Sequence, residues 1–574
     1  MSPIRRALVS SLATGLALWS GAALAQPDTP AQGQMQSQTQ APANGGFDAA
    51  LRLDPTAYTR ITVTVDGAPL MVRRYRATYV AKPVALAAEQ PSRKMGPGGS
   101  PSGAASQTLQ DPLTYQSLYV FVPEGASETA AIILNVNNAG WFASELRAGI
   151  TDGGVYSSTS DTDKAGAALA AGYVYVDVGT RGRGLVGADG GFPGHAPAAV
   201  VDTKAAIRWL RLNDGALAGS AERIVVTGTS GGGGLSAVVA ASGDSRDFLP
   251  FLTEIGAAGV AADGRSTLSD RVFAVIAYCP ITDLGHADMA YEWLYRDVRA
   301  PETTAGGVWG AAQAAASAEL AAGYPAYLAG LELTLADGRS LTTATMPEAV
   351  ARQVALEVER HIAAGGAVPA LGDDFQITLR GFGPGGGRQV EIANDWLEVA
   401  DGKVTRLDLA NFLRFVAKTA ALKPVPAFDR TGNTGNGADG ENTLFGAADQ
   451  SYSNFTPYGW ANNTVAGDGS GPDDTGMSWS EWTAGPGAGL ADQVRLIDPL
   501  TYLGQPTAAA APFWYVRHGM IDRDTGFTVG VVLSRAAAGD ADVKQVNFAT
   551  PWMTPHSGDY DVQEAYGWLK SVLE

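Results

Sequence analysis

Short apolar runs alternate with helical patterns over much of the chain. The runs are rich in Val, Ile and Tyr and are apolar at consecutive positions, which predicts strands buried on both faces. The expected strands are SLYVFVPE, AAIILNVN, YVYVDVG, RIVVTG, RVFAVIAY, FWYVRHG and VKQVNFA. Helices are expected between them, near 162–171, at 200–212, after residue 230, near 526–538 and from about 560 onward. This rhythm predicts an α/β fold with a mostly parallel central sheet.

The N-terminal residues follow other patterns. Two alternating segments, RITVTVDG and LMVRRYRATYV, predict a hairpin, and RKMGPGGSPSGAASQ (93–107) predicts a mobile loop. Residues 1–25 combine a basic start, an apolar stretch and small residues, which indicates a secretory signal peptide. Residues 26–46 are polar and rich in Pro and Gln, which predicts a disordered linker. We therefore expect cleavage after Ala25 and a periplasmic or secreted protein.

The strand–helix rhythm breaks between residues 285 and 498. Helical pieces such as EAVARQVALEVERHIAAGG, Gly/Asp-rich loops and a hairpin around GFGPGGGRQVEIANDWLEV replace it. The rhythm then resumes with FWYVRHG. These changes predict one α/β domain in two parts, 47–284 and 499–574, with a large inserted lid domain at 285–498.

Composition narrows the range of functions. The chain has 40 Lys and Arg against 58 Asp and Glu, a net charge of −18, which argues against nucleic acid as a partner. No segment approaches the roughly 18 unbroken apolar residues that indicate a membrane span. Cys279 is the only cysteine, so no intramolecular disulfide can form and no thiolate metal site is expected. Its place in the apolar run VFAVIAYC predicts a buried structural thiol.

Candidate chemistry begins at a Gly-rich turn. The segment GTSGG (228–232) follows the strand RIVVTG and precedes a helix, so Ser230 stands in G-x-S-x-G in the setting of a nucleophile elbow. Glycines on both sides remove the side chains that would clash in such a strained turn. A Gly/Ser linker is the alternative, because the chain contains 71 glycines. The flanking strand and helix favour the nucleophile.

A serine nucleophile needs a base and an acid, which follow it in the order Ser, acid, His in α/β-hydrolases. Among five histidines, His556 follows the strand VKQVNFA and precedes the last helix, where the base belongs. His518 ends the preceding strand and is expected to be structural. The acid should follow FWYVRHG, where HGMIDRDTGF offers Asp522 and Asp524. Spacing alone does not choose between these two, and aspartates that only form a turn are the alternative.

Backbone N–H groups near Ser230 are expected to stabilise an oxyanion. The helix that begins at the elbow directs its first N–H groups toward the reacting carbonyl, which makes Gly231 the first candidate donor. A second donor should come from the loop NNAGWFASE after the strand AAIILNVN, where Gly140 permits close backbone approach. A glycine that merely turns the chain is the alternative for Gly140.

Several of these segments together resemble the bacterial tannases. They are GTSGGGGLSAVVAASGDSRDFLPFLTEIGAAG, RHGMIDRDTGF, PWMTPHSGDYDVQEAYGWL and NNAGWF, and they lie within about 130–280 and 495–574. Tannases are α/β-hydrolases with a large lid that hydrolyse galloyl esters. The resemblance implies that Asp522 is the triad acid and that Asp524 contacts phenolic hydroxyls of the substrate.

Two lid segments, LKPVPAFD and ENTLFG, also resemble tannase segments. Those segments supply a lysine and a glutamate to the same hydroxyls, which implies these roles for Lys423 and Glu441. The chemistry is reasonable because a site built to bond a hydroxyl rejects analogues that lack it. The alternatives are a cation at the C-terminus of the helix LDLANFLRFVAKTAAL for Lys423 and an exposed loop acid for Glu441.

The sequence therefore predicts an exported serine esterase of galloyl or other hydroxylated aromatic esters. Ser230 would be the nucleophile, His556 the base and Asp522 the orienting acid. No metal or organic cofactor is expected, the partner is a small aromatic ester, and the sequence carries no signal for an oligomeric state. The alternatives are a feruloyl or other aryl carboxylesterase with the same triad, and a non-catalytic α/β-hydrolase-like binding protein. The complete set of serine, histidine and acid argues against the last.

Overall fold

The computed structural model describes most of the chain beyond the N-terminal segment. The described residues are 46–91, 106–261, 263–379, 388–431 and 441–574. The expected signal peptide, nearly all of the linker and most of the 93–107 loop lie outside them. All of the described residues fall within one compact unit, residues 42–574. Within them, no helix combines the length and apolar character needed to cross a membrane.

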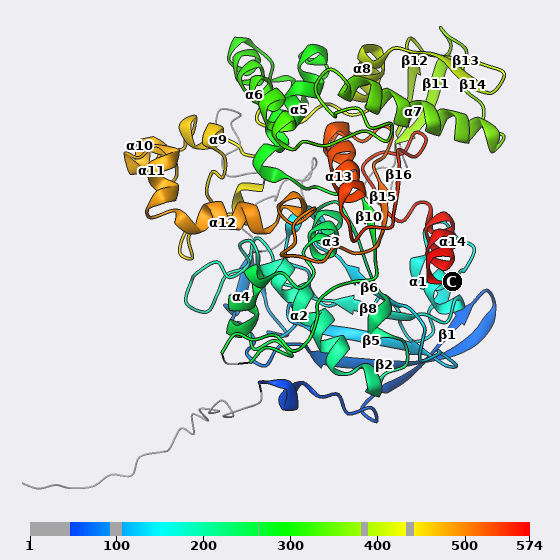
Figure 1. Cartoon of the computed structure of the whole chain (residues 1–574), viewed down its shortest axis with the longest axis vertical. Helices are drawn as coiled ribbons and strands as arrows, with labels where there is room; N and C mark the ends of the chain where they lie inside the picture. Colours follow the sequence, from blue (N-terminus) through cyan, green and yellow to red (C-terminus); the bar gives the residue numbers. More distant parts are fainter. Residues whose placement is uncertain (1–45, 92–105, 262, 380–387, 432–440) are drawn as a thin grey trace, which may run out of the picture. The chain divides into compact units, whose positions relative to one another are not determined.

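Ten strands form one sheet in the order β16-β15-β10-β9-β6-β8-β5-β2-β1-β7 (Figure 1). Neighbours among β6, β8, β9, β10, β15 and β16 run parallel, whereas β5 is antiparallel to both β8 and β2. The bounds are β1 Thr59–Val65, β2 Ala68–Thr78, β5 Ser117–Pro123, β6 Ile132–Val136, β7 Val155–Tyr156, β8 Val174–Val178, β9 Ile224–Thr229, β10 Ala274–Tyr278, β15 Phe513–Arg517 and β16 Gln545–Ala549. The expected strands and the mostly parallel sheet are confirmed.

Helices cover both faces of the sheet, and successive side chains of each strand point to opposite faces. Val226 of β9 packs with the helices of one face and Val225 with those of the other. The first face carries α2 Ala198–Leu212, α3 Gly231–Ala241 and α13 Phe527–Gly539; the second carries α1 Lys164–Ala170 and α14 Val562–Leu573. The expected hairpin is β1–β2, and it extends this sheet at one edge.

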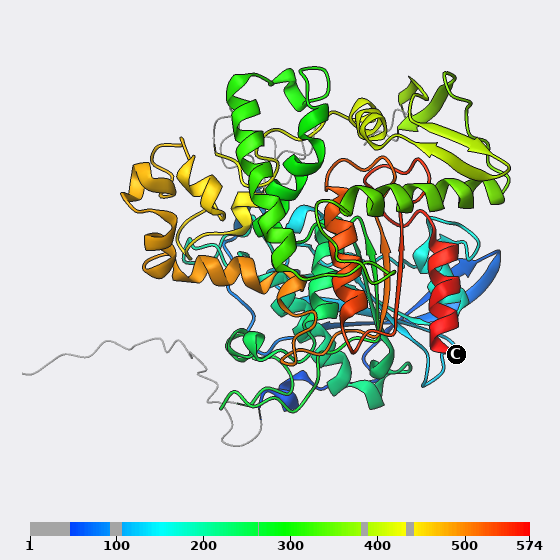
Figure 2. The same ribbon diagram turned by 45° about the horizontal axis from the view of Figure 1, so that its top comes forward.

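A long segment enters the chain between two neighbouring strands. β10 and β15 pair in parallel, with Ala274 opposite Phe513, yet more than 200 residues separate them. The segment contains the helices α5 Leu284–Tyr295, α6 Ala311–Gly330, α7 Met346–Ala363, α8 Leu409–Thr419, α9 Pro457–Ala461, α10 Gly471–Thr475, α11 Trp479–Ala484 and α12 Ala488–Leu496. Figures 1 and 2 show these helices gathered beyond one end of the sheet.

Two small hairpins follow α7 in the inserted segment. β11 Asp374–Leu379 pairs with β12 Arg388–Ala393, and β13 Leu397–Ala400 pairs with β14 Lys403–Leu407. The stretch expected to form one hairpin around 381–399 therefore contributes to two, because Trp396 between them is buried against Phe375 and Phe412. The remaining strands and α-helix are β3 Glu89–Pro91, β4 Ser106–Thr108 and α4 Leu249–Glu254.

Candidate active site

Ser230 stands at a sharp turn between β9 and α3. Its backbone has φ 61° and ψ −123°, a region that non-glycine residues rarely occupy and that costs about 1–3 kcal/mol. A Cβ on Gly228 would lie 2.4 Å from the Gly232 carbonyl oxygen, so no other residue fits there. The Ser230 N–H donates to the Tyr278 carbonyl at 2.9 Å, which ties the turn to β10. The turn has the backbone geometry of a nucleophile elbow.

His556 and Asp522 complete a hydrogen-bonded chain with Ser230. His556 Nε2 lies 2.9 Å from Ser230 Oγ, and His556 Nδ1 lies 2.8 Å from Asp522 Oδ2. Asp522 is fully buried in the loop after β15, and His556 lies in the loop after β16. The parallel strands β9, β15 and β16 thus bring three distant residues together at their carboxyl ends. Such a chain can move a proton from the serine hydroxyl to the imidazole.

The two ionisable groups of this chain stabilise each other's charge. Burial lowers the pKa of the His556 imidazole, but the Asp522 carboxylate outweighs burial and raises that pKa well above its ordinary value. Burial raises the pKa of the Asp522 carboxyl, but the charge of His556 and the hydrogen bonds from His556 and the Asp524 N–H bring it below its ordinary range. Asp522 therefore favours the imidazolium that forms when His556 accepts a proton.

Gly231 lies against the loop after β6. It is the first residue of α3, and a Cβ there would lie 2.1 Å from the Trp141 nitrogen and 2.6 Å from the Asn138 carbonyl oxygen. The short helix η2 Ala139–Trp141 carries Gly140, whose φ of 59° favours glycine. The Trp141 N–H already donates to Asn138. The backbone of Gly231 thus meets the Gly140 loop beside Ser230, as an oxyanion site requires.

Cys279 is buried, as expected, but its surroundings differ from the expected strand core. It follows β10 with φ 44°, and its Sγ lies 3.2 Å from the Ser557 carbonyl oxygen, next to His556. Its sulfur and ligand atoms of Asp522 and His556 lie within 4.8 Å of one another. The neighbouring strands β10 and β15 create this proximity, which no local sequence pattern signals. Burial raises the pKa of the Cys279 thiol.

The other histidines have different surroundings. His518 is fully buried beside Phe527, and burial lowers the pKa of its imidazole. His361 of α7 stacks on Trp552. His286 of α5 stacks on Tyr327 and lies 2.7 Å from Asp283, and His195 stacks on Phe192. Of these four side chains, none is hydrogen-bonded to Ser230 among the described residues.

Asp524 lies beside the chain formed by Ser230, His556 and Asp522. Its N–H donates to Asp522 Oδ1 at 2.8 Å, and its carboxylate pairs with Arg523. The Asp524 side chain is 29% exposed, whereas Asp522 is fully buried. Of the two aspartates, only Asp522 is hydrogen-bonded to His556. The structure therefore distinguishes Asp522 from Asp524, which the spacing in the sequence does not.

The two lid residues lie on segments that reach this region. The N–H of Lys423 donates to the hydroxyl of Tyr291, which also bonds the Arg523 carbonyl, and the Lys423 ammonium lies 3.9 Å from the centre of the Phe428 ring. Glu441 begins the short helix η8 Glu441–Leu444, which packs against η2. Its side chain is only 6% exposed, so the alternative of an exposed loop acid is wrong.

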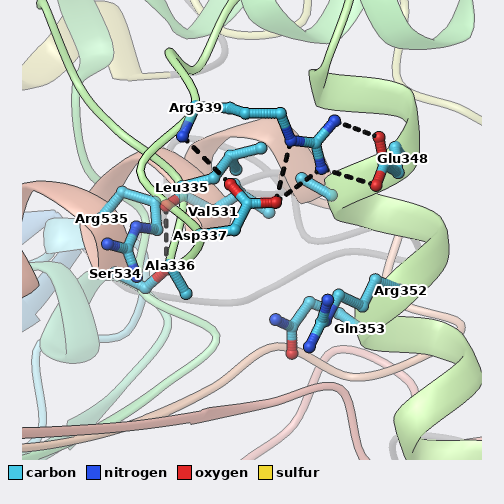
Figure 3. Close-up of a pocket in the computed structure, with 11 residues that line it drawn as sticks. Leu335, Ala336, Asp337, Arg339, Glu348, Arg352, Gln353, Val531, Ser534 and Arg535 are labelled. Carbon is cyan, nitrogen blue, oxygen red and sulfur yellow. Dashed lines mark hydrogen bonds and ion pairs between the residues drawn. The ribbon is translucent and has the colours of Figure 1, made fainter.

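A surface pocket lies elsewhere in the described residues (Figure 3). The turn 335–339, α7 and α13 line it, and none of its lining residues belongs to the chain formed by Ser230, His556 and Asp522. Its most prominent cation, Arg339, is paired with Asp337 and Glu348, as the dashed lines show. These charges satisfy one another, and the pocket offers no nucleophile–base pair.

The parallel sheet, the strand–turn–helix at Ser230 and the two loops that follow β15 and β16 define an α/β-hydrolase fold. A family model described as BD-FAE, which represents an esterase family, matches residues 118–321. That match spans β5 to α6 and includes the Ser230 turn. No curated protein matches the sequence.

Solved structures of tannases are similar over nearly the whole chain. A tannin acyl hydrolase in complex with 3,4-dihydroxybenzoate has a TM-score of 0.70 and 29% identity, covering 92% of this chain and 99% of that one. A tannin acyl hydrolase in complex with ethyl gallate has a TM-score of 0.69 and 28% identity, covering 92% and 100%. The tannase of Fusobacterium nucleatum has a TM-score of 0.67 and 26% identity, covering 91% and 99%. The protein is a carboxylic ester hydrolase that resembles the tannases.

Proposed function

We propose that the protein is a serine esterase that hydrolyses galloyl and related hydroxylated aromatic esters. The observation that carries this proposal is the continuous hydrogen-bonded order Asp522–His556–Ser230, with the nucleophile on a strained turn at a helix N-terminus. Two similar proteins are described as bound to 3,4-dihydroxybenzoate and ethyl gallate, which supports hydroxylated aromatic substrates.

In the proposed reaction, Ser230 Oγ attacks the ester carbonyl carbon while His556 Nε2 accepts the hydroxyl proton. Asp522 holds the imidazole by Nδ1 and stabilises its positive charge. The N–H groups of Gly231 and of the Gly140 loop bind the carbonyl oxygen as it becomes negative. The carbon–oxygen bond to the alcohol then breaks, and the alcohol leaves with the proton of His556. Water, deprotonated by His556, releases the acid and restores Ser230.

The lid supplies selectivity in this proposal. Lys423, Glu441 and Asp524 would bond the ring hydroxyls of the acyl group, because a site whose charged groups bond ring hydroxyls rejects a ring that lacks them. The placement of Lys423 beside the Arg523–Asp524 peptide supports a shared role. So does the packing of η8, which carries Glu441, against the Gly140 loop.

Export is also a proposal, supported by the basic, apolar and small-residue pattern of residues 1–25. N-terminal sequencing of the mature protein tests it: a first residue of Gln26 supports export, and a retained N-terminus in the cytoplasm contradicts it.

The nucleophile is tested with Ser230→Ala. We expect covalent labelling by a fluorophosphonate probe to disappear and kcat/KM for methyl gallate to fall by about 10⁴-fold or more, because the three groups act as a unit. The circular dichroism spectrum should stay unchanged. Labelling that persists in the variant would place the nucleophile elsewhere, and an unlabelled wild type would favour a binding protein.

Ring selectivity is tested with Lys423→Ala, Glu441→Ala and Asp524→Ala. A hydrogen bond to a charged group contributes about 1.5–3 kcal/mol, so each change should narrow the kcat/KM preference for methyl gallate over methyl benzoate by about 10- to 150-fold. Lys418→Ala, an exposed lysine at the end of α8, is the matched control and should leave the preference unchanged. An unchanged preference in all three variants would leave an aryl esterase of different selectivity, such as a feruloyl esterase.

A further inference from the structure

Tyr291 of α5 joins the lid to the loop of the acid. Its side chain is fully buried, and its hydroxyl donates to the Arg523 carbonyl oxygen at 2.7 Å. The same hydroxyl accepts the N–H of Lys423 at 3.1 Å. The phenol hydroxyl therefore acts both as a donor and as an acceptor. It donates to the hydrolase domain, at Arg523, and accepts from the inserted segment, at Lys423.

The peptide that Tyr291 binds is the one before Asp524. Its carbonyl belongs to Arg523, and its N–H, on Asp524, donates to Asp522 Oδ1 at 2.8 Å. A continuous series of hydrogen bonds thus runs from the Lys423 N–H through Tyr291 and this peptide to Asp522. From there it continues through His556 to Ser230. Hydrogen bonds in such a series polarise one another.

The backbone carbonyl of Lys423 is also held by a hydrogen bond. Its carbonyl accepts from Arg299 at 2.9 Å, and the Arg299 guanidinium is paired with Glu292 of α5. Glu292 in turn accepts from Ser317 of α6 at 2.6 Å. The backbone of Lys423 is therefore held at its N–H and at its C=O by side chains of the same helical layer. The Lys423 side chain extends from this fixed backbone to the Phe428 ring, 3.9 Å from its ammonium.

We propose that Tyr291 is a positioning residue for substrate selection, whose hydroxyl sets the distance between Lys423 and Asp524. The proposal rests on the function proposed above, in which these two residues bond the ring hydroxyls. Two charged groups can bond one ring only when their separation matches it, and small displacements in a preorganised site are costly. The Tyr291 hydroxyl bonds the Lys423 N–H and the carbonyl of Arg523, the residue before Asp524, so it fixes the separation of the two backbone segments that carry Lys423 and Asp524.

The test is Tyr291→Phe, which removes the hydroxyl and keeps the ring. We expect the kcat/KM preference for methyl gallate over methyl benzoate to narrow by about 3- to 10-fold, the loss that one neutral hydrogen bond predicts. Hydrolysis of methyl benzoate should change less, because His556 and the Asp524 N–H still hold Asp522. An equal loss for both esters would show a general structural role and overturn the proposal.

Tyr295→Phe is the matched control. Tyr295 is also buried on α5, its ring centre lies 4.8 Å from that of Tyr291, and its hydroxyl has no hydrogen-bond partner among the described residues. Removing this hydroxyl should leave the preference unchanged. If Tyr295→Phe narrows the preference as much as Tyr291→Phe does, packing of the helix rather than the Tyr291 hydroxyl is responsible, and the proposal fails.

A double variant separates this proposal from the function on which it rests. If Tyr291 acts through Lys423, adding Tyr291→Phe to Lys423→Ala should not narrow the preference further. If the double variant narrows the preference for methyl gallate by a further 3- to 10-fold, the role proposed for Tyr291 is wrong, while the function proposed for the site still stands. If Lys423→Ala itself leaves the preference unchanged, Lys423 does not bond the ring hydroxyls, and the part of the proposed function on which the role of Tyr291 rests is wrong.

Amide hydrogen exchange tests the contact between Tyr291 and Lys423 independently of activity, first in the wild-type protein and then in Tyr291→Phe. The Lys423 N–H should be protected, since Tyr291 accepts it inside a buried layer. In Tyr291→Phe this amide should exchange at least about 10-fold faster, while the amides of α3 keep their protection. Rapid exchange of the Lys423 amide in the wild type would contradict the contact and the proposal, whether or not the variant folds.

Discussion

At the scale of single residues, the charge balance between His556 and Asp522 determines when the site is active. His556 must be neutral to accept the proton of Ser230. Burial opposes charge on the imidazole, but the buried Asp522 carboxylate, 2.8 Å from Nδ1, raises the pKa of His556 well above its ordinary value of about 6.5. As pH falls, His556 therefore becomes protonated, and unable to act as a base, at a higher pH than an isolated histidine.

The expected consequence is a shifted pH profile. As pH falls, kcat/KM for methyl gallate should decline with an apparent pKa above 6.5, because His556 becomes protonated in the free enzyme. Asp522→Asn removes the negative charge, so the pKa of His556 should fall and the residual activity should decline at lower pH than in the wild type. The measurement is kcat/KM from pH 5 to 9 for both proteins. If the pH profile of Asp522→Asn is the same as that of the wild type, Asp522 does not set the pKa of the titrating base.

At the scale of elements, the start of α3 is built from glycines because two backbones meet there. Gly231 lies within van der Waals distance of the loop that carries Gly140 and Trp141, and any side chain would displace that loop. The same closeness places the Gly231 N–H and the loop on one side of Ser230. The Gly-rich run is thus a packing requirement of the elbow and of the candidate oxyanion site together.

Gly231→Ala tests this element. A Cβ 2.1 Å from the Trp141 nitrogen must push the loop away, so we expect kcat to fall by about 10²- to 10³-fold, the loss typical of one oxyanion donor. Gly567→Ala is the control: Gly567 lies within α14 and a Cβ there meets nothing within 4 Å. That change should leave kcat unaltered and stabilise the helix by about 0.5–1 kcal/mol. Normal kcat in Gly231→Ala would show that the close approach of the Gly140 loop to Gly231 is not needed for catalysis.

At the scale of the whole molecule, α5 holds separate segments of the lid together through buried polar groups. Asp288, one turn before Tyr291, accepts the N–H groups of Ala427, Phe428 and Asp429 at 2.7–2.9 Å. Asp429 in turn accepts from Asn442, next to Glu441. Asp288 thus secures the segment that follows Lys423, and Asp429 connects it to the segment that begins at Glu441.

The buried carboxyl of Asp288 should make stability depend on pH. Burial raises its pKa to about 7, against about 3.9 in an unfolded chain. Between these values the folded state holds a proton that the unfolded state has lost, so the free energy of unfolding falls as pH rises. Relative to Asp288→Asn, which does not titrate, the wild type should lose at most about 1.4 kcal/mol per pH unit from pH 4 to 7.

Urea unfolding of both proteins at several pH values measures this difference. A difference that grows in favour of the wild type as pH rises would mean that Asp288 is ionised in the folded state. In that case the three backbone N–H groups outweigh its burial. Selectivity measured in the same variant shows whether loosening the Lys423 segment affects the ring preference.

Much of the fold and the elbow could be predicted because their signals are local. Apolar runs at consecutive positions define β6, β8, β9 and β10, and the strand–glycine–helix order around Ser230 depends on neighbouring residues alone. The chain order also singles out His556, since only that histidine lies between the last strand and the last helix. The sequence by itself therefore determined the α/β architecture, the nucleophile candidate and its candidate base.

The tertiary structure alone decided what depends on contacts between distant residues. Ser230 and His556 are 326 residues apart, and Tyr291 and Arg523 are 232 apart. Asp522 and Asp524 are equivalent in spacing, and only the direction of the loop after β15 buries one against His556 and leaves the other part-exposed. Cys279 lies at the end of an apolar strand, and Tyr291 lies on a helix that carries no recognisable motif. Their surroundings arise from the pairing of β10 with β15 and from the docking of α5, which no local pattern encodes.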